Sequence, residues 1–306
     1  MNENWTIENI PDLSGKIIII TGANSGIGFE SAREFVRKGA EVIVASRNPE
    51  KAEQAIVKIR EELPAANLKF IELDLANLAS IRKFTEEFKL GYSRLDILLN
   101  NAGIMLVPFG KTVDGFERTV GTNYLGHFAL TGQLLDRLSA TPGARVVSVA
   151  SNAHYAGEMD FNDLLFDNGG YAPMKAYGRS KLANLLFTYE LQRRFQSTGN
   201  EVIALAAHPG ISATELANHL FFNLISWLIQ PVMKLIFQSS AMGALPSLRA
   251  AVDPEAQGGQ YYGPDGQGEK SGYPIVVDSN SASKNEEDAS RLWDISEKLT
   301  GIKYLD

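Results

Sequence analysis

The chain has 306 residues, of which 44% are hydrophobic and 21% are charged, an ordinary globular composition that excludes a disordered or fibrous protein. With 29 basic and 36 acidic side chains the net charge is −7, so we expect no nucleic-acid partner. There is no cysteine, which excludes disulfides, zinc–thiolate sites and thiol nucleophiles.

The first fifteen residues contain no Lys or Arg and include Glu3, Glu8 and Asp12. A secretory signal has a basic start followed by an apolar run, and neither is found there. No stretch reaches the roughly 18 apolar residues of a membrane-spanning helix. We therefore expect a cytoplasmic protein that does not span a membrane.

Short runs rich in Ile and Val alternate with longer amphipathic stretches. The runs predict strands at 16–20, 41–46, 68–73, 95–100, 144–150 and 201–207, with a seventh near 260–262. The longer stretches predict helices at 26–38, 49–63, 77–90, 114–140, 173–198 and 286–300. This alternation is typical of βαβ units. We expect an α/β fold with a single doubly wound, Rossmann-type parallel sheet of six to seven strands, helices on both faces, and one domain over 1–306.

A glycine-rich loop, TGANSGIG (21–28), directly follows the first predicted strand. In such a loop one glycine permits the turn, a second lets the backbone approach a pyrophosphate, and a third lets the helix pack closely on the sheet. The helix that follows offers its N-terminal N–H groups to phosphates. The candidate cofactor-binding residues here are Gly22, Asn24, Ser25, Gly26, Ile27 and Gly28.

The ends of the next two strands bear on the choice of dinucleotide. The second strand ends in Ser46-Arg47, where an NAD-binding protein usually carries an acidic residue. Arg47 can form paired hydrogen bonds to a 2′-phosphate or stack on adenine. We therefore expect NADP(H) to be preferred over NAD(H). Asp74, followed by Leu75, is placed after the third strand to accept from the adenine amino group.

Six motifs in order resemble the short-chain dehydrogenase/reductase family over roughly residues 14–300. They are TGANSGIG (21–28), NNAG (100–103), TNYLGHF (122–128), SVAS (148–151), YGRSK (177–181) and HPGISAT (208–214). The insertion between Ser151 and Tyr177 and the C-terminal tail resemble the retinol-dehydrogenase-like branch. The resemblance implies a nicotinamide-dependent oxidoreductase.

Tyr177 and Lys181 lie four residues apart on a predicted helix and so share one face. A tyrosine is a poor base at neutral pH, but a neighbouring ammonium favours the phenolate and makes it usable as a general acid/base. We expect this catalytic role for Tyr177, assisted by Lys181, which should also reach the nicotinamide ribose.

The resemblance implies further roles. Ser151, at the end of the fifth strand, would hydrogen-bond and orient the substrate oxygen. Asn123 would position a water for proton relay; the alternative is a polar contact inside the helix. The residues that would flank the cofactor are Asn101, Ala102 and Gly103 on the adenine-side ribose and Pro209, Gly210 and Thr214 at the nicotinamide.

The four histidines, His127, His154, His208 and His219, follow no metal-binding spacing. We interpret them as structural or pocket-lining and expect no metal site.

The segment 216–237 carries one narrow polar stripe on an otherwise apolar helical wheel, divided by Pro231. Three interpretations stay open: a substrate lid (about 212–240, before the last strand), a buried or subunit-contact helix, and a helix that touches a membrane surface without spanning it.

We expect hydride transfer between NADP(H) and a carbonyl/alcohol pair on a mostly apolar substrate. The alternatives are a non-catalytic NADP(H)-sensing or scaffold protein and an enzyme resembling protochlorophyllide reductase, whose cysteines this chain lacks. The helices 114–140 and 173–198 resemble those that pair subunits in the family, which predicts a homodimer.

Overall fold

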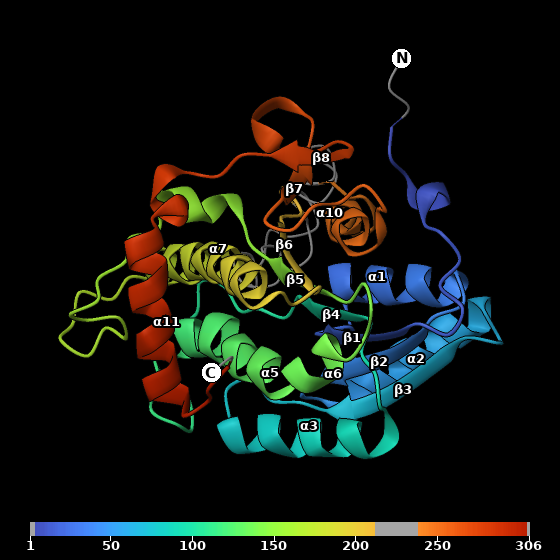
Figure 1. The fold of residues 1–306 in the computed structure, drawn as a ribbon, viewed down its shortest axis with the longest axis horizontal. Helices are drawn as coiled ribbons and strands as arrows, with labels where there is room; N and C mark the ends of the chain where they lie inside the picture. The colour runs from blue at the N-terminus through green and yellow to red at the C-terminus, as the bar shows by residue number, and fades with distance from the viewer. Residues whose placement is uncertain (1–3, 212–237, 305–306) are drawn as a thin grey trace, which may run out of the picture.

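The computed structural model describes residues 4–211 and 238–304. They contain an eight-stranded sheet in the order β3-β2-β1-β4-β5-β6-β7-β8 (Figure 1). The strands are β1 (Ile17–Thr21), β2 (Glu41–Ser46), β3 (Asn67–Glu72), β4 (Ile97–Asn100), β5 (Arg145–Val149), β6 (Ile203–Ala207), β7 (Tyr261–Pro264) and β8 (Pro274–Val277). The strand order reverses between β1 and β4, and open α/β sheets bind ligands in the crevice at such a point.

The doubly wound α/β fold is confirmed, with one strand more than expected. Strands β1 to β7 run parallel, whereas β8 pairs antiparallel with β7 at the edge of the sheet. The prediction did not include β8, because its four residues lie in a turn-rich tail and form no extended alternating pattern.

The helices are α1 (Gly26–Arg37), α2 (Pro49–Glu62), α3 (Leu78–Gly91), α4 (Arg118–Val120), α5 (Gly126–Gln133), α6 (Leu135–Ser139), α7 (Pro173–Thr198), α10 (Ser240–Val252) and α11 (Glu286–Thr300). Short 3-10 turns are η1 (Ile7–Asn9), η3 (Asn152–Ala156), η4 (Gln267–Glu269) and η5 (Ser281–Lys284), and η2 (Gly121–Leu125) is a π-helical turn. Two expectations need correction. The helix predicted over 114–140 begins at Arg118 and is divided by η2 and again at Leu134, and α10 begins inside the range assigned to the lid.

Two apolar layers enclose the sheet. Helices α1, α2 and α10 pack on one face through side chains such as Phe35, Ile56 and Leu248. Helices α3, α5 and α7 pack on the other through side chains such as Phe84 and Phe128 (Figure 1). Covering both faces is what the apolar central strands require.

Helix α11 lies across α7 and α5 (Figure 1). The ring centroid of Trp293 lies 5.2 Å from that of Phe128 and 5.9 Å from that of Phe187, and Trp293 is 1% exposed. Tyr124 and Ser296 add a buried hydroxyl–hydroxyl hydrogen bond of 2.7 Å. The chain's own C-terminal helix therefore occupies part of the face that was expected to pair subunits. That the remaining part of that face pairs subunits stays a prediction.

Within the two described ranges, no helix is both long enough and apolar enough to cross a membrane. The segment 216–237 lies outside the described residues, so its three interpretations stay predictions.

Candidate active site

The loop from Thr21 to Gly28 forms a close-packed cradle between β1 and α1. Gly22 and Gly26 adopt left-handed φ values of 71° and 56°, which glycine tolerates best. A Cβ at Gly28 would lie 2.5 Å from the Gly22 carbonyl oxygen and 2.6 Å from Asn101 Nδ2. Ser25 is the N-cap of α1, and its side chain makes no capping hydrogen bond. The first turn of α1 thus presents N–H groups without intrahelical acceptors to an anion.

Thr21 joins this loop to the NNAG segment. Its Oγ1 accepts hydrogen bonds from the backbone N–H groups of Asn101 and Ala102, both at 2.9 Å. Asn101 Nδ2 donates back to the Thr21 carbonyl at 2.8 Å. Thr21 was not among the predicted site residues, although its place at the start of the glycine motif was a usable signal.

The end of β2 lies against the same loop, because the N–H of Gly22 donates to the Ala45 carbonyl at 2.8 Å. Arg47 follows two residues later and is exposed, whereas Ser46 is buried. Asp74 holds its own turn through Oδ1, which accepts from the Ala76 N–H at 3.0 Å. Leu75 is buried against α5, where a Cβ on Gly126 would meet its carbonyl oxygen.

Tyr177 and Lys181 stand one turn apart on α7, as predicted. The ammonium of Lys181 lies 5.6 Å from the centroid of the Tyr177 ring. Lys181 is 4% exposed, and its Nζ donates to the Val149 carbonyl at 2.8 Å. Ser151 lies two residues beyond Val149, and its Oγ accepts from the Ala153 N–H at 3.2 Å. The carboxyl end of β5 and α7 therefore bring all three side chains to one edge of the sheet.

Arg179 keeps the insertion between Ser151 and Tyr177 folded onto α7. It is 1% exposed and donates to the carbonyls of Glu158, Asp163 and Leu164 at 2.7 to 3.0 Å. Its guanidinium also lies 4.0 Å from the Phe166 ring centroid. The long spacing in sequence is thus accommodated without separating the two ends of the insertion.

Asn123 is buried in the π turn η2. Its Oδ1 accepts from the Ile104 N–H at 2.8 Å, and its Nδ2 donates to the Ile104 carbonyl at 2.9 Å and to Ser180 Oγ at 3.0 Å. A Cβ at Gly103 would lie 3.4 Å from Asn123 Oδ1 and 3.7 Å from Lys181 Nζ. The structure thus brings Asn123, Gly103 and Lys181 together.

His208 holds the loop that was predicted to flank the nicotinamide. The Gly210 N–H donates to His208 Nδ1 at 3.2 Å, and Nε2 lies 2.9 Å from Glu269. Burial lowers the pKa of His208 to about 3, and burial also raises that of Glu269. A neutral imidazole therefore donates through Nε2–H to Glu269 and accepts at Nδ1. Pro209 accepts a hydrogen bond from the Gln238 amide, and Thr214 lies outside the described residues.

Asn184 also contacts the site but was not among the predicted site residues. Its Nδ2 donates at 3.1 Å to the same Val149 carbonyl that accepts from Lys181. Its position three residues after Lys181, on the same helical face, was the available signal.

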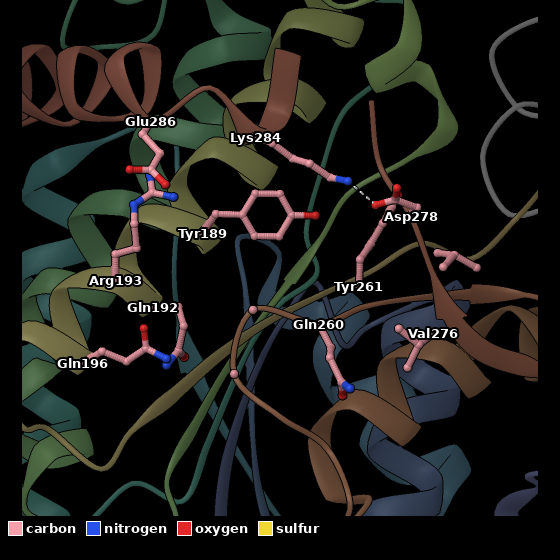
Figure 2. A pocket seen from close by; sticks show the side chains of 13 residues that line it. Tyr189, Gln192, Arg193, Gln196, Gln260, Tyr261, Val276, Asp278, Lys284 and Glu286 are labelled. Carbon is pink, nitrogen blue, oxygen red and sulfur yellow. Dashed lines mark ion pairs between the residues drawn. The ribbon is translucent and has the colours of Figure 1, made fainter. Parts of the chain in front are cut away.

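A hollow outside this site lies between α7 and the β7–β8 edge (Figure 2). Tyr189, Tyr261 and an ion pair between Asp278 and Lys284 line part of it. None of the predicted site residues lines this hollow. Across the described ranges, no three His, Asp or Glu side chains gather as a metal site would require.

A family model described as short chain dehydrogenase matches residues 16–223. The chain therefore belongs to the short-chain dehydrogenase family and is an oxidoreductase that acts on CH–OH groups.

The chain is similar to two named dehydrogenases and to one protein of solved structure. It is 42% identical over 295 residues to retinol dehydrogenase 12 of Mus musculus, covering 95% of this chain and 88% of that one. It is 40% identical over 304 residues to polyprenol dehydrogenase of Homo sapiens, covering 95% and 87%. A crystal structure of an uncharacterised protein from Mycobacterium paratuberculosis matches with a TM-score of 0.84 and 41% identity, covering 99% and 100%.

Proposed function

We propose that this enzyme transfers a hydride between NADP(H) and a carbonyl/alcohol pair on an apolar substrate, with Tyr177 as general acid/base. The observation that carries the proposal is that Tyr177 and Lys181 lie together on α7, with Lys181 bonded to the Val149 carbonyl, two residues before Ser151. Gly103 and Asn123 lie beside Lys181. A sensor or scaffold does not require these three residues at one edge of the sheet.

The residues present fit a dinucleotide. The tight packing around Gly28 leaves no room for a side chain where the backbone must approach a ligand. Gly22 to Gly28 would hold the pyrophosphate at the start of α1. Asn101 to Gly103 and Lys181 would hold ribose groups, and Asp74 would accept from adenine. A bound nicotinamide supplies the hydride chemistry.

The protein's own part is to orient the substrate and move a proton. Ser151 Oγ accepts from the Ala153 N–H, so its own proton is available to donate to a substrate oxygen. Tyr177 would give a proton to that oxygen during reduction and take it back during oxidation. Lys181, whose Nζ is held by the Val149 carbonyl, would stabilise the phenolate. Asn123 would hold the water that returns the proton to Tyr177.

Arg47 supports NADP(H) as the preferred cofactor, with NAD(H) used less well. It is exposed at the end of β2, within two residues of the contact between Ala45 and Gly22. A guanidinium there would form charge-assisted hydrogen bonds to a 2′-phosphate, which NAD(H) lacks.

Two observations support an apolar substrate. The relatives named above act, by their names, on retinol and polyprenol, both long apolar alcohols. In this chain the NNAG motif is followed by the half-buried run 104–107 (IMLV), in which Leu106 adopts a left-handed φ of 54°. Strain of this kind in a non-glycine residue gathers at ligand sites.

The test is oxidation of NADPH, and separately of NADH, against carbonyls graded from short polar ketones to long-chain and retinoid aldehydes. We expect turnover that rises with apolar length and is faster with NADPH. Tight NADPH binding without turnover across the panel would favour the sensor instead. A cytoplasmic location and a homodimer stay predictions, and size-exclusion chromatography with light scattering measures the second.

A further inference from the structure

His127 lies between the cofactor loop and the proton-relay residue. It is the second residue of α5 and is 4% exposed. Its Nδ1 lies 2.9 Å from the Asn123 carbonyl, and its Nε2 lies 2.9 Å from Thr21 Oγ1. Thr21 ends β1 and immediately precedes Gly22, so a single imidazole connects the glycine loop to η2.

Counting donors and acceptors fixes which nitrogen carries the proton. The Asn123 carbonyl can only accept, so Nδ1 must be protonated. Thr21 Oγ1 accepts from the N–H groups of Asn101 and Ala102, which uses both of its lone pairs. Its hydroxyl proton then goes to Nε2 at 2.9 Å rather than to the Leu99 carbonyl at 3.4 Å.

The ring is neutral under ordinary conditions. Burial lowers the pKa of His127 to about 4, and the positive charge of Lys181 acts in the same direction. The hydrogen bond to the Asn123 carbonyl raises this pKa but does not offset burial. Thr21 and His127 thus form a hydrogen-bond bridge. At neutral pH every donor in it points the same way, from the N–H groups of Asn101 and Ala102 through Thr21 and His127 to the Asn123 carbonyl.

The bridge ends at Asn123, in a turn whose geometry is typical of functional sites. Asn123 lies in a π turn, in which the Gly126 N–H donates to the Gly121 carbonyl five residues back. Such turns lack the regular α-helical ladder and recur at functional sites. The Asn123 side chain is fixed by Ile104 and Ser180, whereas its carbonyl is held by His127.

We propose that His127 is a positioning residue that sets the carbonyl of Asn123 relative to the Thr21 end of the cofactor loop. It thereby aligns the proton relay with the bound cofactor. The inference rests on the proposed function for the role of Asn123, but the hydrogen-bond bridge itself does not.

Two substitutions separate the two halves of the bridge. In His127→Asn the amide nitrogen takes the place of Nδ1, which keeps the bond to Asn123 and loses the bond to Thr21. In His127→Gln the amide oxygen takes the place of Nε2, which keeps the bond to Thr21 and loses the other. Thr85→Val is the matched control, because it removes the partly buried hydrogen bond of 2.9 Å from Thr85 of α3 to Gln133 of α5, outside the predicted site.

We expect His127→Gln to lower kcat about tenfold, as loss of a buried hydrogen bond in the relay would, with the NADPH Kd within about twofold of wild type. The pH profile of kcat should shift as well. His127→Asn should lower kcat by a smaller factor, about two- to fivefold, and raise the NADPH Kd about two- to fivefold. Thr85→Val should lower the Tm and leave kcat, Kd and the pH profile unchanged.

The inference is overturned if the Asn and Gln variants lose kcat equally and keep the wild-type pH profile and NADPH Kd. An independent measurement, which needs no turnover, is the ¹⁵N chemical shift of the His127 ring nitrogens. These signals are assigned by their loss in His127→Gln. They should show the neutral Nδ1–H form from pH 5 to 9. A charged or Nε2–H ring would overturn the bridge. A wild-type enzyme that binds NADPH but reduces no carbonyl would count against the proposed function, and the Kd and ¹⁵N measurements would still test the hydrogen-bond bridge through His127.

Discussion

The substitution Gly28→Ala tests the cradle that we assign to the dinucleotide. The added Cβ would lie 2.5 Å from the Gly22 carbonyl oxygen and 2.6 Å from Asn101 Nδ2. Neither neighbour can swing away freely, because the first is backbone and the second is bonded to the Thr21 carbonyl. Forcing a methyl group into such a contact costs about 1–3 kcal/mol.

The cost should appear in cofactor binding, because α1 can escape the contact only by moving its N-terminus away from the loop. At about 1.4 kcal/mol per tenfold change, the NADPH Kd should rise between about fivefold and about a hundredfold. Fluorescence titration measures the Kd, and urea unfolding measures any part of the cost that falls on stability.

Gly91→Ala at the end of α3 is the matched control. It has no left-handed φ, and its nearest neighbour would be Lys69 Nζ at 3.9 Å. It should leave the Kd unchanged and stabilise the helix by up to about 1 kcal/mol. If Gly28→Ala binds NADPH as tightly as wild type and is equally stable, the cradle argument fails.

Three further predictions concern other parts of the molecule. Arg47→Ala should weaken NADPH binding about tenfold to a hundredfold and leave NADH binding within about twofold, since only NADPH carries the 2′-phosphate; equal losses in paired titrations would refute the phosphate contact. Trp293→Ala should cost about 3–5 kcal/mol of unfolding free energy by urea denaturation, because it empties the contact between α11 and α7; a loss below about 1 kcal/mol would contradict this packing. Burial would raise the pKa of Asp96, but hydrogen bonds from Arg94, the Ile17 N–H and Lys16 outweigh it and hold that pKa below its usual value. Asp96 therefore stabilises the fold above its unfolded pKa of about 4, and this stabilisation is lost as the pH falls through the folded-state pKa. The Tm difference between wild type and Asp96→Asn should shrink from pH 7 to pH 3, and a constant difference would refute it.

The central strands and α7 could be predicted because their signals are local. Buried parallel strands are apolar on both faces, and α7 spans the whole of the predicted range 173–198. The ends of those elements then place Ser151, Tyr177 and Lys181 by topology alone, since carboxyl ends of parallel strands share one edge.

Features that depend on tertiary contacts were missed. The π turn at Gly121–Leu125 changes the spacing of the helical hydrogen bonds, which the pattern of apolar residues does not reveal, so that pattern indicated one continuous helix over 114–140. Helix α10 contains Pro246, which weakens a helical signal, although Ser239 caps it. The hydrogen bonds of Thr21 to His127 and to the segment after β4 join residues 80 to 106 positions apart, so the sequence alone could not predict them.

Tyr177→Phe tests the central claim most directly, with NADPH oxidation against the preferred apolar aldehyde as the measurement. Removing the hydroxyl leaves the ring and its contact with Lys181 but takes away the transferable proton. The account predicts that kcat falls by about a hundredfold or more, the usual contribution of a general acid, while the NADPH Kd stays near wild type. Turnover at the wild-type rate would contradict the assignment of Tyr177 as the general acid/base.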